Sequence, residues 1–91
     1  KKDPLMWGAI SGQSSVVTTL VNAGAELDIP DDKNLTALMR AAWSGHLSIV
    51  NQLIAAGADP NRRDNNGLSA IEYAKREGHK GIIESLKIAI K

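Results

Sequence analysis

The sequence has no cysteine and no apolar run near the length of a membrane-spanning helix. Without cysteine the chain can form neither a disulfide framework nor a thiolate metal site, so packing has to stabilise it. This suits an intracellular protein, and we expect a cytoplasmic location. Because a run of about 18 apolar residues and a basic-then-apolar leader are both missing, we expect no membrane segment and no secretion signal.

An excess of charge of one sign is also missing. The chain has 91 residues with 11 Lys and Arg against 10 Asp and Glu, and the halves 1–45 and 46–91 carry net charges of −1 and +2. This asymmetry is too small to indicate binding of nucleic acid or of a membrane surface. Hydrophobic residues make up 43% and charged residues 23%, which is typical of one small globular domain.

A period of 33 residues organises the sequence. A shift by this period aligns residues 3–13, 36–46 and 69–79 without a gap, and the segments after them stay in step. The aligned apolar positions include three equivalent leucines, Leu20, Leu53 and Leu86. A fixed period of 20 to 50 residues indicates a stack of repeated units.

The middle unit contains two helical patterns. Leu38, Ala41 and Ala42 are spaced i, i+3 and i+4, and residues 49–54 repeat this spacing, which predicts two short amphipathic helices. Thr36 is suited to cap the first helix and Gly45 to end it in a left-handed conformation. Ser48 is a candidate to start the second helix, and Gly57 to end it.

The segment 59–68 between units is rich in turn-forming residues and predicts a hairpin loop. Asn34 occupies the position equivalent to Gly67, and both residue types tolerate positive φ. We therefore expect a left-handed turn residue at this position of each loop.

These units resemble the ankyrin repeat family. The middle unit matches the family pattern at Asp31, Thr36, Leu38, Ala41, Ala42, Gly45, His46, Val50, Leu53, Gly57, Ala58, Asp59 and Asn61. The resemblance implies an all-α solenoid of helix-turn-helix units joined by β-hairpin-like loops, with about three repeats. We expect a single domain with units of about 1–30, 31–63 and 64–91. We expect the chain to start inside the first helix, with no loop before it, and to end without a terminating glycine. Two complete helix pairs with ragged ends then indicate a fragment of a longer chain, or a domain bounded by further repeats.

The histidine that the family carries early in its first helix is replaced in all three units. Met6, Met39 and Glu72 stand at this position. The hydrogen bonds that the family histidine makes between repeats are then absent, and we expect the methionines to fill the space by packing.

The candidate catalytic and metal-binding residues can all be explained by structural roles. His46 and His79 recur at the corner between paired helices, where the first unit has Gln13, a residue unable to shuttle a proton. We therefore interpret both as structural imidazoles that bond to backbone. The adjacent carboxylates Asp31 and Asp32 resemble solvated turn residues more than an acid–base pair. With no glycine-rich phosphate loop either, we expect no enzymatic activity, no cofactor and no metal.

Two further loop features leave alternatives open. The pair Arg62 and Arg63 could bind a phosphate or an acidic peptide, although a solvated loop is the more economical interpretation. Asn61 matches a position that is sometimes hydroxylated in the family, with Leu53 and Asp59 upstream, but Pro60 departs from that pattern. An asparagine that ties the hairpin backbone is the alternative.

The positions at which the units disagree predict a partner-binding surface. The resemblance implies a concave face formed by the hairpin tips and first helices. Near the end of the first helix, the three units carry Ile10, Trp43 and Arg76 at the same position. A packed position would not accept three side chains so different in size and polarity, so we expect the end of each first helix to face outward. The candidate partner-binding residues are Ile10, Asp32, Lys33, Leu35, Trp43, Ser44, Arg63, Asn65, Asn66, Leu68, Arg76 and Glu77.

Trp43 is the most informative of these candidates. An exposed indole beside Leu35, Ile10 and Leu68 would form an apolar patch with a polar rim, and its truncation should then cost binding but hardly stability. The alternative is that Trp43 packs on its own or a neighbouring repeat. Trp7 and Tyr73 align with Arg40 and are expected to be half-buried packing residues.

Three functions remain open. The leading hypothesis is a non-catalytic scaffold that binds another protein on the concave face. The alternatives are a regulatory or targeting module of an enzyme, and a structural segment that self-associates or packs on adjacent repeats through its ends.

Overall fold

The computed structural model describes residues 3–90, and within this range the chain folds into six α-helices. In chain order they are α1 (Pro4–Ser11), α2 (Ser14–Asn22), α3 (Ala37–Ser44), α4 (Leu47–Ala55), α5 (Ala70–Glu77) and α6 (Lys80–Ile90). No residue of that range lies in a β-strand. The predicted all-α repeat fold is confirmed, but it contains three complete helix pairs where we expected two with ragged ends.

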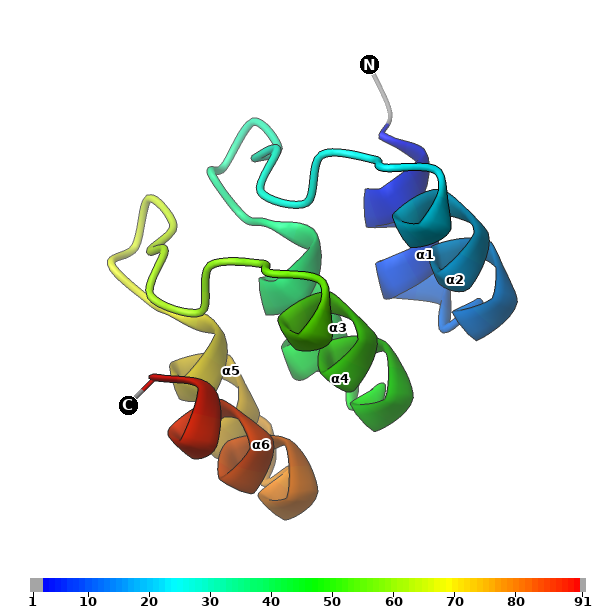
Figure 1. Ribbon diagram of the computed structural model, residues 1–91. Coiled ribbons are helices and arrows are strands. Elements are labelled where there is room, and N and C mark those ends of the chain that lie inside the picture. Colours follow the sequence, from blue (N-terminus) through cyan, green and yellow to red (C-terminus); the bar gives the residue numbers. More distant parts are fainter. Residues whose placement is uncertain (1–2, 91) are drawn as a thin grey trace.

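The three helix pairs stack in a row (Figure 1). The first helices α1, α3 and α5 contact one another in succession, and the second helices α2, α4 and α6 do the same. The two long loops, residues 23–36 and 56–69, extend to the same side of the row (Figure 1). The middle pair therefore has a neighbour on both sides, whereas the first and last pairs each have one open end face.

The first helices begin at equivalent capping residues. Asp3 accepts a hydrogen bond from the backbone N–H of Leu5, so α1 has its own cap, and the expectation that the chain begins inside this helix is wrong. Thr36 caps α3 as predicted. Ser69 and Glu72 form a reciprocal capping box at α5, in which Glu72 accepts from the Ser69 N–H at 2.8 Å.

The expectation that Ser48 starts the second helix of the middle unit is wrong. Helix α4 begins at Leu47, and no side chain caps it. The Ser48 hydroxyl instead lies 3.4 Å from the hydroxyl of Ser14 in the preceding repeat. The predicted helix ends are more accurate, because Gly45 ends α3 with a φ of 84°.

Each hairpin loop is closed by an aspartate. Oδ1 of Asp31 and Oδ1 of Asp64 each accept hydrogen bonds from the backbone N–H groups two and four positions later, all at 2.9 Å. Asn34 has a φ of 69° and Gly67 a φ of 77°, which confirms the predicted left-handed position. Backbone bonds close the same turns, from the N–H of Asp31 to the carbonyl oxygen of Leu35 at 2.8 Å and from the N–H of Asp64 to that of Leu68 at 3.0 Å, although no strand is formed within residues 3–90.

The core consists mainly of positions that recur with the repeat. Leu38, Leu53 and Leu86 are fully buried, and small alanines such as Ala41 allow the first helices to approach one another closely. Met39 is 1% exposed, in agreement with the prediction that methionine fills the space of the family histidine. No helix in residues 3–90 is long and apolar enough to cross a bilayer.

Candidate protein-binding face

The ends of the first helices face outward, as the disagreement between units predicted. Ile10 is 46% exposed and Trp43 40%, and Arg76 at the equivalent position is exposed as well. We use the term first-helix face for the exposed residues of α1, α3 and α5 together with the hairpin tips. It contains Trp7, Ile10, Asp32, Lys33, Trp43, Ser44, Arg63, Asn65, Asn66, Arg76 and Glu77.

Two of the predicted partner-binding residues do not belong to this face. Leu35 is 3% exposed and lies in the core cluster, and Leu68 is half-buried against it, so the expectation that they flank Trp43 in an exposed patch is wrong. Each follows a left-handed turn residue, and its backbone N–H is held by the hairpin aspartate. Leu35 therefore belongs to the core, and Leu68 packs against it.

Trp43 is exposed and packed at the same time. Its ring stacks on Tyr73 of the next repeat, with centroids 4.9 Å apart and an interplanar angle of 19°. The guanidinium of Arg40 lies 5.4 Å from the Trp43 centroid, and that of Arg76 lies 5.9 Å from the Tyr73 centroid. This contact bears out the alternative that Trp43 packs on a neighbouring repeat. Because stacked aromatic pairs contribute about 0.5–1.5 kcal/mol, we now expect its truncation to lower the free energy of unfolding as well.

The equivalent residues Trp7 and Tyr73 differ in burial. Tyr73 is 4% exposed, which fits the predicted packing role, but Trp7 is 52% exposed and does not fit it. The physical reason is the stacking order, since Trp43 of the preceding repeat covers Tyr73 and no residue among 3–90 covers Trp7 in the same way. Trp7 therefore adds an apolar ring to the first-helix face that the sequence comparison missed.

Two hairpin carboxylates hold the residues around Trp43. Asp31 pairs with Arg40 at 2.9 Å, and Asp64 accepts a hydrogen bond from the Tyr73 hydroxyl. Burial acts to raise the pKa of both aspartates, but hydrogen bonds from these partners and from backbone amides outweigh burial, so both pKa values are lowered. Burial, together with the Asp64 carboxylate, raises the pKa of Tyr73 to about 12. At neutral pH the aspartates are ionised and the phenol is neutral.

The exposed cations and anions of the face are partly paired with each other. Arg63 donates to Oε1 of Glu72 at 3.0 Å and to the carbonyl oxygen of Gly67 at 2.7 Å. No carboxylate within residues 3–90 forms an ion pair with Lys33 or Arg76. These two residues present free positive charge next to the Trp43–Tyr73 stack and the hairpin tips.

The histidines lie at the joints between repeats. Nε2 of His79 is 3.1 Å from the carbonyl oxygen of Trp43, so the imidazole bonds to the backbone of the preceding repeat. The His46 ring lies against Gly12 and the His79 ring against Gly45, close enough that a β-carbon on either glycine would meet the ring. Within residues 3–90, no three His, Asp or Glu side chains are grouped in a way that could hold a metal ion.

The interpretation that the Asn61 side chain ties the hairpin backbone is wrong. The Asn61 side chain is exposed, and it is Asp59 that makes the local tie, because Oδ1 of Asp59 accepts from the Asn61 N–H at 2.9 Å. Arg62 is half-buried and donates to the carbonyl oxygen of Asp28 at 3.4 Å. The Arg62 guanidinium therefore bridges two loops and is not simply solvated.

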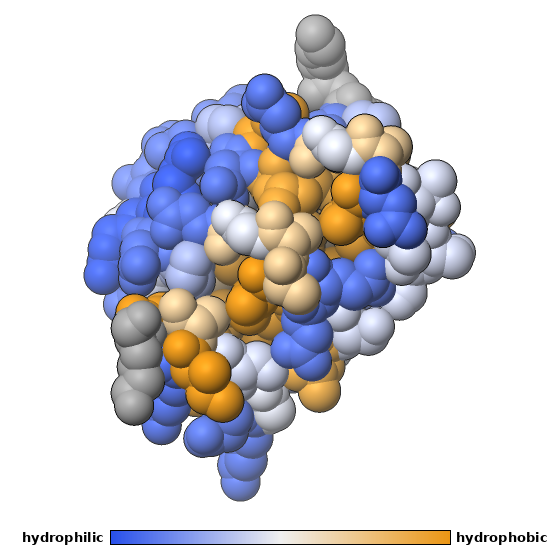
Figure 2. Space-filling view, viewed as in Figure 1, coloured by the Kyte–Doolittle hydropathy of each residue, from blue (hydrophilic) through white to orange (hydrophobic). Residues whose placement is uncertain are grey.

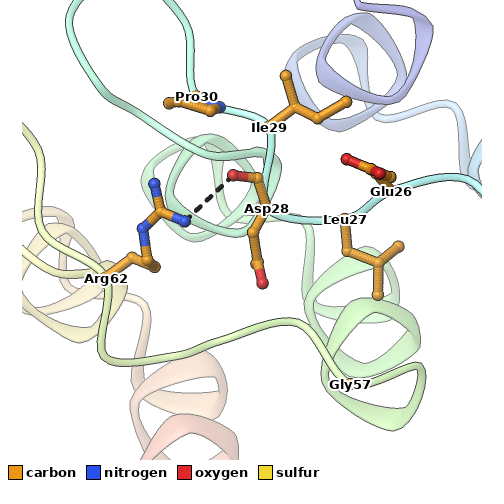
Figure 3. Close-up of a pocket in the computed structure, with 7 residues that line it drawn as sticks. All are labelled: Glu26, Leu27, Asp28, Ile29, Pro30, Gly57 and Arg62. Atoms are coloured by element: carbon orange, nitrogen blue, oxygen red, sulfur yellow. Dashed lines mark hydrogen bonds between the residues drawn. The ribbon is translucent and has the colours of Figure 1, made fainter.

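This bridge forms one wall of a shallow hollow of about 510 Å³ between the loops (Figure 3). Figure 3 shows Arg62 reaching across to the first loop, whose Asp28 carboxylate also accepts from the backbone N–H of Asp59 at 3.0 Å. The lining residues are Glu26, Leu27, Asp28, Ile29, Pro30, Gly57 and Arg62. Because Arg62 and Asp28 already bond across the gap, we interpret the hollow as a joint between repeats.

The stack of helix pairs with aspartate-closed hairpins defines a repeat solenoid. A family model for ankyrin repeats, in three copies, matches residues 5–90, and the chain belongs to the ankyrin repeat family. Ankyrin repeats are generally protein-protein interaction modules and typically not enzymes. A search of curated proteins found no match to the chain.

Proposed function

We propose that this protein is a non-catalytic scaffold that binds another protein on its first-helix face. The observation that carries the proposal is the half-exposed Trp43 ring, held between two side chains that are themselves fixed. Arg40 is anchored on Asp31 and Tyr73 on Asp64, so the ring is pre-positioned before a partner arrives. Large, stiff aromatic anchors of this kind are enriched among residues that dominate binding energy.

The face changes character along the stack, which suggests the chemistry of the partner. Trp7 and Ile10 give the first repeat an apolar end, Trp43 stacks in the middle, and Arg76 adds an unpaired cation in the third repeat. A complementary segment would place apolar side chains against the first two repeats and a carboxylate near Arg76. The partner we propose is a protein segment that is apolar at one end and acidic at the other.

The test compares two exposed apolar residues in the middle repeat. Trp43 and Leu47 are 40% and 42% exposed, but Trp43 belongs to the first-helix face and Leu47 opens the second helix. Immobilised wild type, Trp43→Ala and Leu47→Ala are compared for proteins captured from a cell extract, at a temperature where circular dichroism shows all three folded. We expect Trp43→Ala to reduce capture by about thirtyfold or more, equivalent to about 2 kcal/mol, and Leu47→Ala to have little effect.

A charge reversal gives a second, independent measurement. Arg76→Glu should weaken capture at low salt and lose that effect at high salt, because an exposed charge acts mainly through screened attraction. If Trp43→Ala and Arg76→Glu both capture the same proteins as wild type in equal amounts, the first-helix face is not the binding surface.

A further inference from the structure

The tip of the second hairpin contains an asparagine that is followed by glycine. Asparagine is a chemically labile residue, because the backbone nitrogen of the next residue can attack its side-chain amide. A side chain on that next residue hinders the approach, and glycine has none. The residues that follow the six asparagines are Ala23, Leu35, Gln52, Arg62, Asn66 and Gly67. Asn66 is therefore the asparagine whose amide is least shielded by its neighbour.

Both residues of this pair are open to solvent. Asn66 and Gly67 are exposed, and a β-carbon on Gly67 would have nothing within 4 Å. Among residues 3–90, Asn66 forms a hydrogen bond through its backbone N–H and none through its side-chain amide. The hairpin extends away from the helices (Figure 1), and Figure 2 shows hydrophilic side chains gathered over the hairpins. The amide is thus free to turn, and water has access to it.

One hydrogen bond restrains the attacking nitrogen. The N–H of Gly67 donates to the carbonyl oxygen of Asp64 at 3.0 Å, and the N–H of Asn66 donates to Oδ1 of the same aspartate at 2.9 Å. While the first of these bonds is intact, the Gly67 nitrogen is directed at Asp64 and not at the Asn66 amide. Exposed hydrogen bonds at a loop tip open locally at a much smaller free-energy cost than global unfolding. The turn therefore slows the attack relative to a free peptide but does not prevent it.

The first hairpin provides an internal comparison. It has Asn34 at the position of Gly67, and the buried Leu35 follows this asparagine. Asn22 and Asn51 lie in α2 and α4, where helical hydrogen bonds fix the following backbone nitrogen. The combination of an exposed asparagine, a following glycine and a loop tip occurs at the second hairpin.

We propose that Asn66 is a site of spontaneous deamidation, which converts a neutral amide into a carboxylate at the tip of the second hairpin. The backbone nitrogen of Gly67 loses its proton and bonds to Cγ of Asn66, while the Cγ–Nδ2 bond breaks and ammonia leaves. Water then opens the resulting cyclic imide. Opening at Cγ gives aspartate, and opening at the backbone carbonyl gives isoaspartate, in which the main chain runs through Cγ. The net reaction takes up one water and releases one ammonia, without oxidation or reduction.

The two products change the first-helix face in different ways. Both lower the formal net charge of +1 by one unit and add a carboxylate to the hairpin tip. Isoaspartate also adds one backbone atom between the N–H groups of residues 66 and 68, both of which donate to Oδ1 of Asp64 at 2.9 Å. Asp64 in turn accepts from the Tyr73 hydroxyl, and Tyr73 stacks on Trp43. The isoaspartate form therefore loosens the support of Trp43, whereas the aspartate form changes only the charge.

Peptide mapping of the 91-residue chain tests the proposal without any binding partner, so its outcome is independent of the proposed function. The chain is incubated at neutral pH, with circular dichroism showing that it stays folded, beside a synthetic peptide of residues 64–75, which trypsin releases by cleavage after Arg63 and Lys75. Mass spectrometry measures conversion at each asparagine, and an isoaspartyl methyltransferase assay detects isoaspartate. We expect Asn66 to be the most converted asparagine, more slowly in the folded chain than in the peptide. Complete conversion of the peptide with none at Asn66 of the folded chain would refute the proposal, as would faster conversion at another asparagine.

Two variants test the role of Gly67 in the reaction. Gly67→Asn introduces the residue that the first hairpin has at this position, where Asn34 adopts a φ of 69°. This variant should keep its urea midpoint within about 0.2 M and convert Asn66 several-fold more slowly. Asn65→Gln, at the neighbouring exposed position, should convert Asn66 at the wild-type rate. Equal rates in Gly67→Asn and wild type would contradict attack by the Gly67 nitrogen.

The urea midpoints of the two products test the structural consequence. Asn66→Asp reproduces the aspartate product and should unfold within about 0.2 M of wild type, because the side chain is exposed. The purified isoaspartate form should unfold at a urea concentration lower by about 0.5 M or more, because the turn around Asp64 is lengthened. Equal midpoints for these two forms would show that the added backbone atom does not loosen the Asp64 turn, contrary to this inference.

Discussion

Substituting Gly45 tests how much the contact between the middle and third repeats contributes to the free energy of unfolding. Gly45 ends α3 with a φ of 84°, and a β-carbon on it would lie 2.7 Å from Cε1 of His79 in the next repeat. Gly78 occupies the equivalent position in the last repeat with a φ of 73°, and nothing lies within 4 Å of a β-carbon there. Substituting each by alanine therefore imposes the same left-handed strain but a different contact.

The expected costs follow from this difference. An alanine held in the left-handed region costs about 1–2 kcal/mol, and that is the whole effect we expect for Gly78→Ala. At Gly45 the His79 ring must also move, and its contact with the carbonyl oxygen of Trp43 at 3.1 Å is lost. A hydrogen bond contributes about 0.5–1.5 kcal/mol and the displaced ring loses packing as well. We expect Gly45→Ala to cost about 2–4 kcal/mol.

Urea unfolding followed by circular dichroism measures both free energies, and a double-mutant cycle isolates the contact. If the His79 ring is the obstacle, Gly45→Ala should cost less in a His79→Ala background than in the wild type. The same cycle with Gly78→Ala should show no coupling. Equal costs for Gly45→Ala and Gly78→Ala, with no coupling to His79, would refute the interpretation of the histidine as a clamp between repeats.

The core and the hairpin each give one further prediction. Leu53→Ala should lower the free energy of unfolding by about 2–5 kcal/mol, because the side chain is fully buried. Leu20→Ala, at the equivalent half-buried position, should lower it clearly less. A loss below about 1 kcal/mol for Leu53→Ala in urea unfolding would contradict the assignment of Leu53 to the core. For Tyr73 the folded pKa is about 12 against an ordinary value of 10.0, so its stabilising effect is complete below pH 10 and is lost as the pH rises towards 12. Urea unfolding between pH 8 and 12 should therefore show a free energy of unfolding that falls with rising pH, and the fall should be smaller in Tyr73→Phe.

The repeat period was sufficient to predict the fold, and the comparison of units explains where the site prediction failed. Leu35 was assigned to the binding surface, yet its equivalent is Leu68, and this agreement between units already indicated an inward position. Ile10, Trp43 and Arg76 do disagree, and all three are exposed. The rule that disagreement indicates exposure held at that position, but it fails at the position of Trp7, Arg40 and Tyr73, where the units also disagree and Tyr73 is buried.

The stack of Trp43 on Tyr73 could not be found by aligning units. An alignment compares equivalent positions, whereas this contact joins two positions that are not equivalent. The stacking step brings the end of one first helix against the middle of the next. The same offset explains why Trp7 is exposed and Tyr73 buried, although the two occupy the same position in their repeats. Such contacts depend on the geometry between repeats, which the period does not specify.

One repeated position on the first helices, Arg40 in the middle repeat and Tyr73 in the third, joins these helices to the hairpins. At this position Arg40 binds the carboxylate of Asp31, and Tyr73 binds the carboxylate of Asp64. A guanidinium and a phenol differ in charge and shape, yet each donates to an aspartate that also holds its own hairpin turn. Both also contact Trp43, so the ring is tied to both hairpins at once. A partner that touches the hairpin tips and the indole then meets groups whose relative positions are already fixed, which lowers the entropy lost on binding.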